Sequence, residues 1–461
     1  MERLSVPRIL ISSATLSGGK SLFSLGLAYE LRRRNIGVSC ILLGSNLSQA
    51  ALLRRLSGRN VSLIDDRLLS KSQSLMALYQ AGVGADVVLI EGQAGLFDNF
   101  DAKGENICGD AEWAALSGTP VCLLVDAVAY GTSVAALVKG YSVCARDFSV
   151  EGVILNRLSP EQMKYRNEYY AAMRSYELPE PLGFVPESKI EVQLPPNEIS
   201  QEKNRALLPL QVFAELGDLV SRHINVEALM KAANTAEVTV LENFEWTPSN
   251  RRTRIAVSDD SCFNLCYQNN LEWIRYFGAE TVSFSPLADG ELPSGIGGVY
   301  LTGGCIKEYG EELSRNKEMR ESLRSFAAAG GVIYAEGSAT AFLCDDFKGA
   351  EDQVFSGVGI ISGSAVSDSL TPSFHEAVTL EETIVGRAGM KFKLVNTGEW
   401  KIKRLERAVR ALRFEGHKGE SILEGYSPGA QVFCTLSLCH FGSNPQVAKN
   451  LVDSCQVVGG V

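Results

Sequence analysis

The sequence lacks the long apolar runs of membrane proteins and the basic runs of nucleic-acid-binding proteins. No stretch is apolar over the roughly 20 residues that a transmembrane helix needs. The formal net charge is −10, and the short basic clusters Arg32–Arg34 and Arg251–Arg252 are typical of a solvated helix end and a linker. Because an acidic chain is poorly suited to nucleic acid or an anionic membrane surface, we expect neither as a partner.

The sequence also has little that would build a disulfide framework or a metal centre. Its 11 cysteines are odd in number and scattered. Cys262, Cys266 and the pair Cys439–His440 come nearest to a set of metal ligands, but they lack the C-x-x-C spacing of zinc sites, and buried structural thiols are the favoured interpretation. Residues 1–7 do not resemble a secretory signal, because a core strand follows at once. We therefore expect a cytoplasmic protein with free thiols.

What the chain does have is length, apolar content and a regular alternation of patterns. It has 461 residues, of which 45% are hydrophobic, enough for two or three domains. A helical pattern over 21–34, with Leu22, Leu25, Leu27 and Leu31 toward a core, follows the first predicted strand. The first half predicts strands at 8–12, 38–43, 87–91, 121–126 and 152–156. Strands separated by helices indicate an α/β fold with a parallel sheet covered on both faces.

A change of composition after residue 236 divides the chain. Residues 201–236 predict helix, and residues 237–253 contain Pro, Ser, Asn and paired Arg, which are typical of a linker. A second alternation then begins, with strands predicted at 254–257, 298–302 and 331–335. We therefore predict an N-terminal domain over 1–236 and a C-terminal domain over 254–461.

A partial phosphate-binding loop follows the first predicted strand. Residues 13–21 read Ser-Ala-Thr-Leu-Ser-Gly-Gly-Lys-Ser, which differs from G-x-x-x-x-G-K-[ST] in having Ala14 at the first glycine position. The expected nucleotide-binding residues are Ser17, Gly18, Gly19, Lys20 and Ser21. Lys20 would neutralise phosphate charge and Ser21 would ligate Mg²⁺. The alternative is a glycine-rich turn with a solvated lysine.

Acidic residues lie at or just after the ends of two predicted strands. Glu91 ends one strand, Asp98 lies shortly after it, and Asp126 ends another. Because ligands collect beyond the carboxyl ends of parallel strands, these residues are candidates for the same site. Glu91 is the predicted partner of Ser21 in holding Mg²⁺, and we assign Lys20 and Glu91 as the catalytic pair. Asp126 could equally cap a helix.

The order of several motifs over both halves resembles the cobyrinic acid a,c-diamide synthase family. The motifs, besides the loop at 13–21, are Glu91-Gly92-x-x-Gly95-Leu96-Phe97-Asp98, Val125-Asp126-Ala127, Gly152-Val153-Ile154-Leu155-Asn156-Arg157, Leu182-Gly183-Phe184-Val185-Pro186, Leu301-Thr302-Gly303-Gly304 and His440-Phe441-Gly442-Ser443-Asn444-Pro445. The resemblance implies a dethiobiotin synthetase-like P-loop domain that uses ATP and Mg²⁺ to activate a carboxylate. It also implies a class I glutamine amidotransferase-like domain that releases ammonia for attack on the acyl phosphate. The substrates it implies are tetrapyrrole carboxylates of cobalamin biosynthesis.

The chain departs from the family at positions that carry chemistry. The family's Glu-Cys-Gly-Gly turn reads Glu336-Gly337-Ser338-Ala339, so the glutaminase nucleophile is absent at Gly337. The loop at 44–50 lacks the carboxylates of the family's Gly-Pro-Asp-Tyr-Ile-Asp-Pro, whereas Glu112 is kept. His440 keeps one family histidine but has no thiol partner at the turn, which favours a packing or capping role.

Two interpretations of function remain open at this point. In the first, the chain is an ATP-dependent amidoligase that takes ammonia in place of glutamine and acts on a small-molecule carboxylate of tetrapyrrole type. In the second, it is a non-catalytic pseudoenzyme that binds a nucleotide or a tetrapyrrole-like ligand. In that case it would alternatively pair with an active relative. Under either interpretation a homodimer is a candidate assembly. Retention of Lys20, Ser21 and Glu91 favours the first interpretation, and losses in both halves favour the second.

Overall fold

The computed structural model of the protein describes residues 2–99, 108–188, 209–236, 239–241, 252–349, 353–405, 409–416 and 419–455. The chain separates into two compact units, one of residues 1–198 with 208–244 and the other of residues 199–207 with 245–461. Most of the expected linker over 237–253, and the first part of the predicted helix over 201–236, lie outside the described residues. Each unit is described by itself below.

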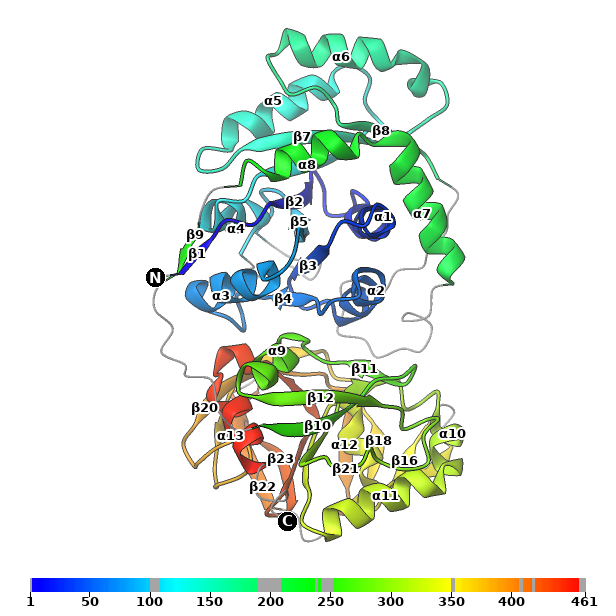
Figure 1. Cartoon of the computed structure of the whole chain (residues 1–461), viewed down its shortest axis with the longest axis vertical. Helices are drawn as coiled ribbons and strands as arrows, with labels where there is room; N and C mark the ends of the chain where they lie inside the picture. Colours follow the sequence, from blue (N-terminus) through cyan, green and yellow to red (C-terminus); the bar gives the residue numbers. More distant parts are fainter. Residues whose placement is uncertain are drawn as a thin grey trace. The chain divides into compact units, whose positions relative to one another are not determined.

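The N-terminal unit is built on a seven-stranded sheet in which every neighbouring pair is parallel (Figure 1). Its order is β4-β3-β5-β2-β6-β7-β8. The strands are β2 (Arg8–Ser13), β3 (Val38–Leu43), β4 (Ser62–Ile64), β5 (Val87–Gly95), β6 (Val121–Asp126), β7 (Val150–Leu158) and β8 (Gly183–Pro186). The five strands predicted for this half are confirmed. β4 and β8, at 3 and 4 residues, are too short to produce a pattern of their own.

Helices cover both faces of this sheet, as the α/β class requires. Figure 1 shows α1 and α2 on one side of the strands and α3 and α4 on the other. The helices are α1 (Lys20–Arg33), α2 (Leu47–Ser57), α3 (Lys71–Gly82), α4 (Asp110–Ser117), α5 (Val134–Cys144), α6 (Arg166–Ser175), α7 (Leu210–His223) and α8 (Val226–Ala233). Among the described residues no helix is both long enough and apolar enough to cross a bilayer.

Helix α1 is buried on two sides because α7 packs over it. Leu25, Leu27 and Leu31 are buried as predicted, whereas Leu22 is only half-buried and Phe23 is buried instead. Two glycines permit the close approach of the helices. A Cβ on Gly26 would lie 2.7 Å from the backbone oxygen of Leu216, and one on Gly217 would overlap the Tyr29 ring. Strands β1 (Glu2–Leu4) and β9 (Thr239–Leu241), the first and the last of this unit in the sequence, pair with each other antiparallel.

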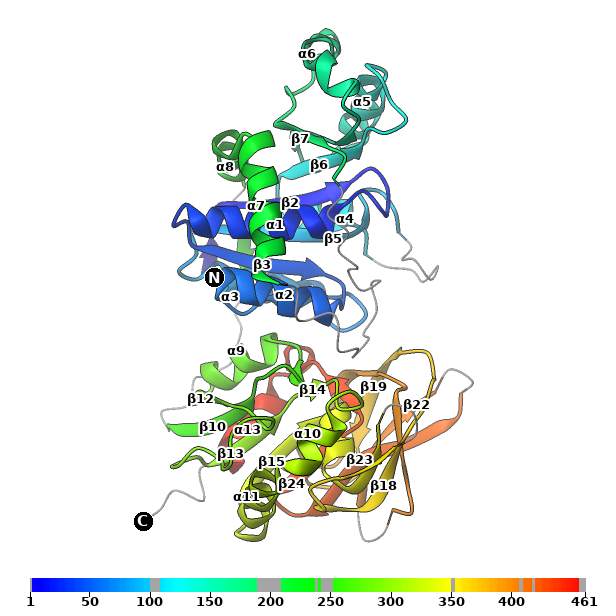
Figure 2. The same ribbon diagram turned by 90° about the vertical axis from the view of Figure 1, so that its right-hand side faces the viewer.

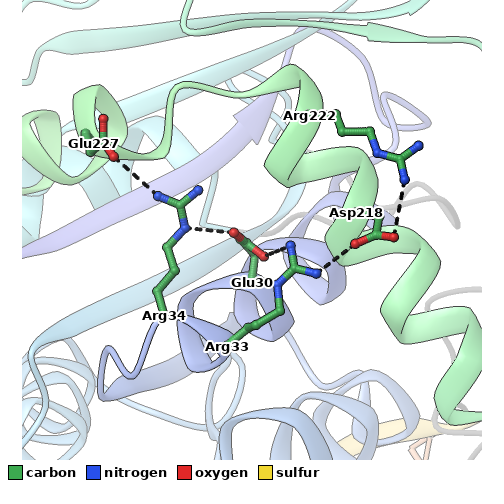
Figure 3. Close-up of polar contacts among 6 residues, drawn as sticks. All are labelled: Glu30, Arg33, Arg34, Asp218, Arg222 and Glu227. Atoms are coloured by element: carbon green, nitrogen blue, oxygen red, sulfur yellow. Dashed lines mark hydrogen bonds and ion pairs between the residues drawn. The ribbon is translucent and has the colours of Figure 1, made fainter.

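A network of six charged side chains links the end of α1 to α7 and α8 (Figure 3). Glu30 is the only buried member, and it lies 2.5 Å from Arg33 Nη2 and 2.7 Å from Arg34 Nε. The arginines continue to the later helices through Arg33–Asp218, Arg222–Asp218 and Arg34–Glu227 pairs at 2.7, 3.6 and 3.5 Å. Exposed ion pairs contribute little stability individually, so the main effect of the network is to neutralise the buried Glu30 carboxylate.

The C-terminal unit is built on a ten-stranded mixed sheet of order β12-β10-β13-β15-β24-β23-β22-β19-β20-β25. The half from β12 to β24 is parallel and the other half is antiparallel. The strands are β10 (Thr253–Ser258), β12 (Ala279–Phe284), β13 (Gly298–Leu301), β15 (Val332–Glu336), β19 (Ser373–Thr379), β20 (Lys391–Asn396), β22 (Val409–Glu415), β23 (Ser421–Gly429), β24 (Val432–Thr435) and β25 (Ser437–Cys439). The predicted strands are confirmed, but none of the antiparallel half was predicted.

Two small sheets and short helices complete this unit, as Figure 2 shows from the side. The sheets are β17 (Val354–Ser356), β16 (Cys344–Lys348), β18 (Ile361–Ser367) and β21 (Trp400–Lys403), and the pair β11 (Phe263–Leu265) with β14 (Gly303–Gly304). The helices are α9 (Asn269–Tyr276), α10 (Gly310–Arg315), α11 (Lys317–Ala328), α12 (Ser338–Phe342), α13 (Gln446–Ser454) and the 3₁₀ helix η4 (Phe441–Ser443). In each unit, β-α connections bring the carboxyl ends of neighbouring parallel strands to one edge of the main sheet.

The crossing of α1 and α7 predicts opposite effects for the same substitution at two helical glycines. Gly26→Ala places its Cβ against backbone and should destabilise the N-terminal unit by about 1–3 kcal/mol. Gly140→Ala, in α5, meets nothing within 4 Å and should be neutral or stabilising by about 0.5–1 kcal/mol. Urea unfolding of both variants measures the difference. Equal effects at the two positions would contradict the close crossing.

Candidate functional site

The candidate nucleotide site lies at the carboxyl end of β2, the central strand of the parallel sheet. The chain turns after Ser13 and enters α1 through Gly19, which has φ of 94° and provides no side-chain cap. The left-handed backbone favours glycine at that position. A Cβ on Gly18 would overlap Ser13, and one on Gly19 would approach Asn156 Nδ2 at 2.7 Å. The loop therefore needs both glycines, and the first N–H groups of α1 are free of a side-chain cap.

Lys20 lies in this site but is turned inward. Its Nζ donates to the backbone oxygen of Ala94 at 2.7 Å and to Ser13 Oγ at 3.0 Å, and the residue is only 5% exposed. Burial lowers the pKa of Lys20, and the nearby carboxylates of Asp110, Glu91 and Asp98 oppose that shift. The ammonium is thus held among oxygens at the end of β5.

Ser21 and Glu91, predicted as a metal-binding pair, are in direct contact. Ser21 Oγ donates to Glu91 Oε1 at 2.6 Å, and Gln49 Nε2 donates to Glu91 Oε2 at 3.0 Å. Burial raises the pKa of Glu91, while these two hydrogen bonds and the charge of Lys20 lower it. Residues 44–50, expected as a loop without the family's carboxylates, run into helix α2 after Asn46, and Gln49 in its first turn places an amide against Glu91.

The sequence analysis missed the most buried carboxylate of this site, Asp110. It begins α4, is fully buried, and accepts from Ser12 Oγ at 2.5 Å and from the Gln93 N–H at 2.9 Å. Burial raises its pKa to about 6, and Lys20 opposes the shift. Gly92 leaves room for it, because a Cβ there would overlap the Asp110 carboxylate. The sequence analysis named Glu112, which is exposed, and the Asp two residues before it was the feature that could have identified this carboxylate.

The other two acidic candidates have structural partners near the sheet edge. Asp98 Oδ2 accepts from the Gly95 N–H at 3.1 Å. Asp126 pairs with Arg157 at 2.7 Å and accepts from the Val128 N–H at 3.1 Å, which leaves it on the β6–β7 side. The structure therefore gathers Lys20, Ser21 and Glu91 and places Asp126 apart from their contacts.

The loop fits a bound nucleotide and one hard cation. The Gly18–Gly19 backbone has no room for side chains, the start of α1 has no side-chain cap, and a buried lysine stands beside it. Mg²⁺ usually takes one or two protein oxygens together with phosphates and water, which matches the Ser21–Glu91 pair. The described residues contain no group of three or more acidic, histidine or cysteine side chains that could hold a metal by themselves.

The turn predicted for a glutaminase nucleophile is present in the C-terminal unit with its strained backbone. Gly337 lies between β15 and α12 with φ of 60° and ψ of −135°, a conformation that is costly for any residue with a side chain. Its N–H donates to the oxygen of Ser437 at 3.2 Å. The backbone shape that would aim a nucleophile persists although no nucleophile is there.

Ser338 cannot replace the missing thiol, because backbone groups occupy its hydroxyl. Ser338 Oγ donates to the Gly304 oxygen at 2.7 Å and accepts from the Gly304 N–H at 2.8 Å, in a fully buried position. His440 is also buried, and its Nδ1 accepts from the Gly442 N–H at 3.1 Å, which caps η4. The capping role expected for His440 is confirmed.

A buried carboxylate lies directly before the turn. Glu336 accepts from the hydroxyls of Tyr300 at 2.6 Å and Tyr334 at 3.1 Å, and from the Cys439 N–H at 3.2 Å. Burial raises its pKa to about 7, against the effect of these hydrogen bonds. The native state therefore holds a proton that the unfolded chain releases at lower pH.

The raised pKa of Glu336 predicts a pH-dependent stability. Its contribution is fully present below the unfolded pKa near 4.5 and is lost as the pH rises through about 7. Glu336→Gln should remove this component, so stability should fall less between pH 5 and pH 8, by on the order of 2–3 kcal/mol. Urea unfolding across that range measures it, with exposed Glu382→Gln controlling for loss of one charge. An unchanged pH slope in Glu336→Gln would refute the assignment.

Comparison with known proteins finds relatives over most of the chain and a family model over its second half. Residues 254–432 match the CobB/CobQ-like glutamine amidotransferase domain. A cobyrinate a,c-diamide synthase of Listeria monocytogenes serotype 4b is 30% identical over 387 residues, which cover 83% of this chain and 84% of that protein. The corresponding protein of Leptospira interrogans is 26% identical over 98% of this chain and 99% of its own length.

Solved structures resemble separate parts of the chain at low similarity. MinD of Aquifex aeolicus has a TM-score of 0.30 and 15% identity, covering 51% of this chain and 100% of its own. PurLQS of Thermotoga maritima has a TM-score of 0.34 and 14% identity, covering 44% and 98%. At TM-scores this low, the two matches carry no argument about the fold. The extent and identity of the match to the Listeria protein decide the matter: the chain belongs to the cobyrinate a,c-diamide synthase family.

Proposed function

We propose that the N-terminal unit joins ammonia to a carboxylate at the expense of ATP, and that the C-terminal unit releases no ammonia from glutamine. The observation that carries the proposal is a contrast between the two units. The Lys20, Ser21 and Glu91 group is assembled at the end of β2 and β5. At the turn after β15, Gly337 has no side chain and the Ser338 hydroxyl is bound on both sides by Gly304.

The proposed reaction balances in two steps. A carboxylate oxygen attacks the γ-phosphorus of ATP, and ADP leaves. The lone pair of ammonia then attacks the acyl carbon, phosphate leaves, and the nitrogen loses a proton to give the amide. Positioning and neutralisation of phosphate charge are what the protein must supply in the first step. To do so, Lys20 exchanges its contact with Ala94 for one with phosphate.

Ser21 and Glu91 are the residues proposed to hold Mg²⁺. The ion would offset the charge of the transferring phosphoryl group. Glu91 already accepts from Ser21 and Gln49, so the pair is oriented before any ligand binds. Asp110 does not reach the loop surface and is proposed as a positioning residue that joins Ser12 to the Gln93 backbone.

The acceptor that we propose is a side-chain carboxylate of a tetrapyrrole acid in cobalamin biosynthesis. The support is the relatives of the chain, which are named cobyrinate a,c-diamide synthases. Ammonia as donor distinguishes this chain within that proposal, because a covalent route through glutamine needs a nucleophile at position 337.

A non-catalytic, nucleotide-binding protein is the second candidate. It is favoured by the inward orientation of Lys20, whose Nζ is already bonded to Ala94 and Ser13. It is also favoured by Gln49 of α2, an amide within the segment 44–50 where the family carries carboxylates. Nucleotide binding without turnover on any tetrapyrrole acid and ammonium would select this candidate.

The proposed nucleotide site predicts that Lys20→Ala weakens binding of MgATP about tenfold or more. The reason is the loss of a charge-assisted contact, worth roughly 1.5–3 kcal/mol. Isothermal titration calorimetry measures the affinity, and thermal unfolding of the same sample shows whether the fold is kept. Lys231→Ala, on the exposed surface of α8, is the matched control and should bind as the wild type does. No heat with ATP, ADP or GTP and Mg²⁺ in the wild type would reject the site.

The proposed nitrogen donor predicts a labelling pattern. The purified chain with ATP, Mg²⁺ and a tetrapyrrole acid should incorporate ¹⁵N from ammonium and none from amide-labelled glutamine. The rate should rise with pH, since neutral ammonia is the nucleophile. Glutamate release from glutamine should stay at the level of a protein-free blank. Glutamine-dependent amidation by this chain alone, seen by mass spectrometry, would overturn the assignment of Gly337.

A further inference from the structure

A cavity of about 260 Å³ opens beside the candidate site, on the side of β5 where β3 and β4 lie. Leu43 and Ile64, the last residues of β3 and β4, line it together with Gln93 of β5. The backbone N–H of Gln93 is held by Asp110, and Glu91 lies two residues earlier on the same strand. The cavity therefore shares the strand end that carries the proposed metal ligand.

The inner wall of the cavity is apolar and buried. Leu43, Ile64, Leu69 and Trp113 are exposed by only 7, 5, 4 and 3%. At about 30 Å³ per water molecule the space corresponds to about nine waters, slightly below the ≈ 300 Å³ at which sites for whole small molecules begin. A short side arm or a small acid fits this space, whereas a macrocycle would remain outside it.

Hydrogen-bond donors are available at the wall and at the mouth. The Trp113 Nε1–H is buried and has no acceptor among the described residues. Lys71, the first residue of α3, lines the mouth, is exposed, and has no ion-pair partner in the described part of the chain. An unpaired donor in a protein interior is unfavourable, so an oxygen acceptor brought into the cavity would be stabilised.

Two carboxylates, Asp66 and Glu112, also line the mouth and oppose an anionic ligand. Both are exposed, so solvent and salt screen their repulsion. Partial desolvation and the neighbouring Asp65 raise the pKa of Asp66, although its side chain reaches solvent. The Trp113 donor therefore lies on the buried wall, whereas Lys71 and the two carboxylates lie at the mouth.

We propose that this cavity binds the carboxylic arm of the acceptor, and that Lys71 pairs with the carboxylate as a specificity-determining residue. The identity of the acceptor rests on the proposed function, which the inference deepens by naming the part of the substrate that enters the protein. The apolar wall takes the methylene groups of the arm. The macrocycle of a tetrapyrrole stays outside.

Binding of a small acid to the full chain, without nucleotide, tests the proposal. Hexanoate is the probe, and hexylammonium is its counterpart of equal length and opposite charge. Fluorescence of Trp113 reports occupancy, and Trp113→Phe identifies its signal among the four tryptophans of the chain. Hexanoate should change the Trp113 emission and hexylammonium should not.

Four variants, one of them a control, distinguish the effect of charge from the effect of cavity volume. Lys71→Met should weaken hexanoate binding about two- to fivefold, and less so at high salt, as expected for one exposed ion pair. Lys231→Met, on α8 and away from the cavity, should leave it unchanged. Ser74→Leu fills the cavity from α3 and should weaken binding at least tenfold. Glu112→Gln should strengthen it, because a repelling charge is removed.

Several results would overturn the proposal. Stronger binding of hexylammonium than hexanoate would make the cavity a cation site. Hexanoate binding that Lys71→Met leaves unchanged would remove the assigned role of Lys71, and no binding by the wild-type chain would remove the site. None of these measurements uses ATP or turnover. A failure of amidation with hexanoate binding intact would therefore count against the proposed function and not against the acid site.

Discussion

Burial of charge at the end of β2 and β5 is the constraint on which the N-terminal unit depends. Lys20 loses hydration there, and the carboxylates of Asp110, Glu91 and Asp98 compensate. Each of these carboxylates must in turn be bonded, so Ser12, Ser21 and the N–H groups of Gly95 and Gln93 face them. The glycines at 18, 19 and 92 follow from the same crowding, since side chains there would fill the space that the polar groups need.

The C-terminal unit meets a similar constraint with a different result. Glu336 is buried just before the turn, and two tyrosine hydroxyls and the Cys439 N–H satisfy it. The strained turn at Gly337 is kept, but the next side chain closes on Gly304. Packing and hydrogen bonds around the turn hold its backbone in this conformation. The conformation therefore persists although no reactive side chain is present.

In the proposed scheme the two units therefore differ in what they contribute. The parallel sheet of the N-terminal unit presents its strand ends as a row, with the nucleotide loop after β2 and the cavity beyond β5. ATP and a carboxylic arm would meet at the shared end of β5, where Glu91 and Gln93 lie. The C-terminal unit has a hydrophobic core that includes residues of β13, β15 and α11, and in that scheme ammonia would come from solution.

The sequence by itself determined the longer strands of the N-terminal sheet, strands β10, β13 and β15 of the C-terminal sheet, the glycine-rich loop and the missing nucleophile, because local runs of apolar residues and single residue identities carry that information. It did not determine the antiparallel strands β19, β20, β22, β23 and β25, which are partly exposed and of which some pair with strands distant in the sequence, as β20 does with β25. Tertiary structure alone decided that Asp110, and not Glu112, faces Lys20, and that Lys71 and Trp113 line one cavity. The position of the helix start, the order of the strands and the burial of the residues decide which of the two neighbouring carboxylates points inward. No local sequence pattern carries that information.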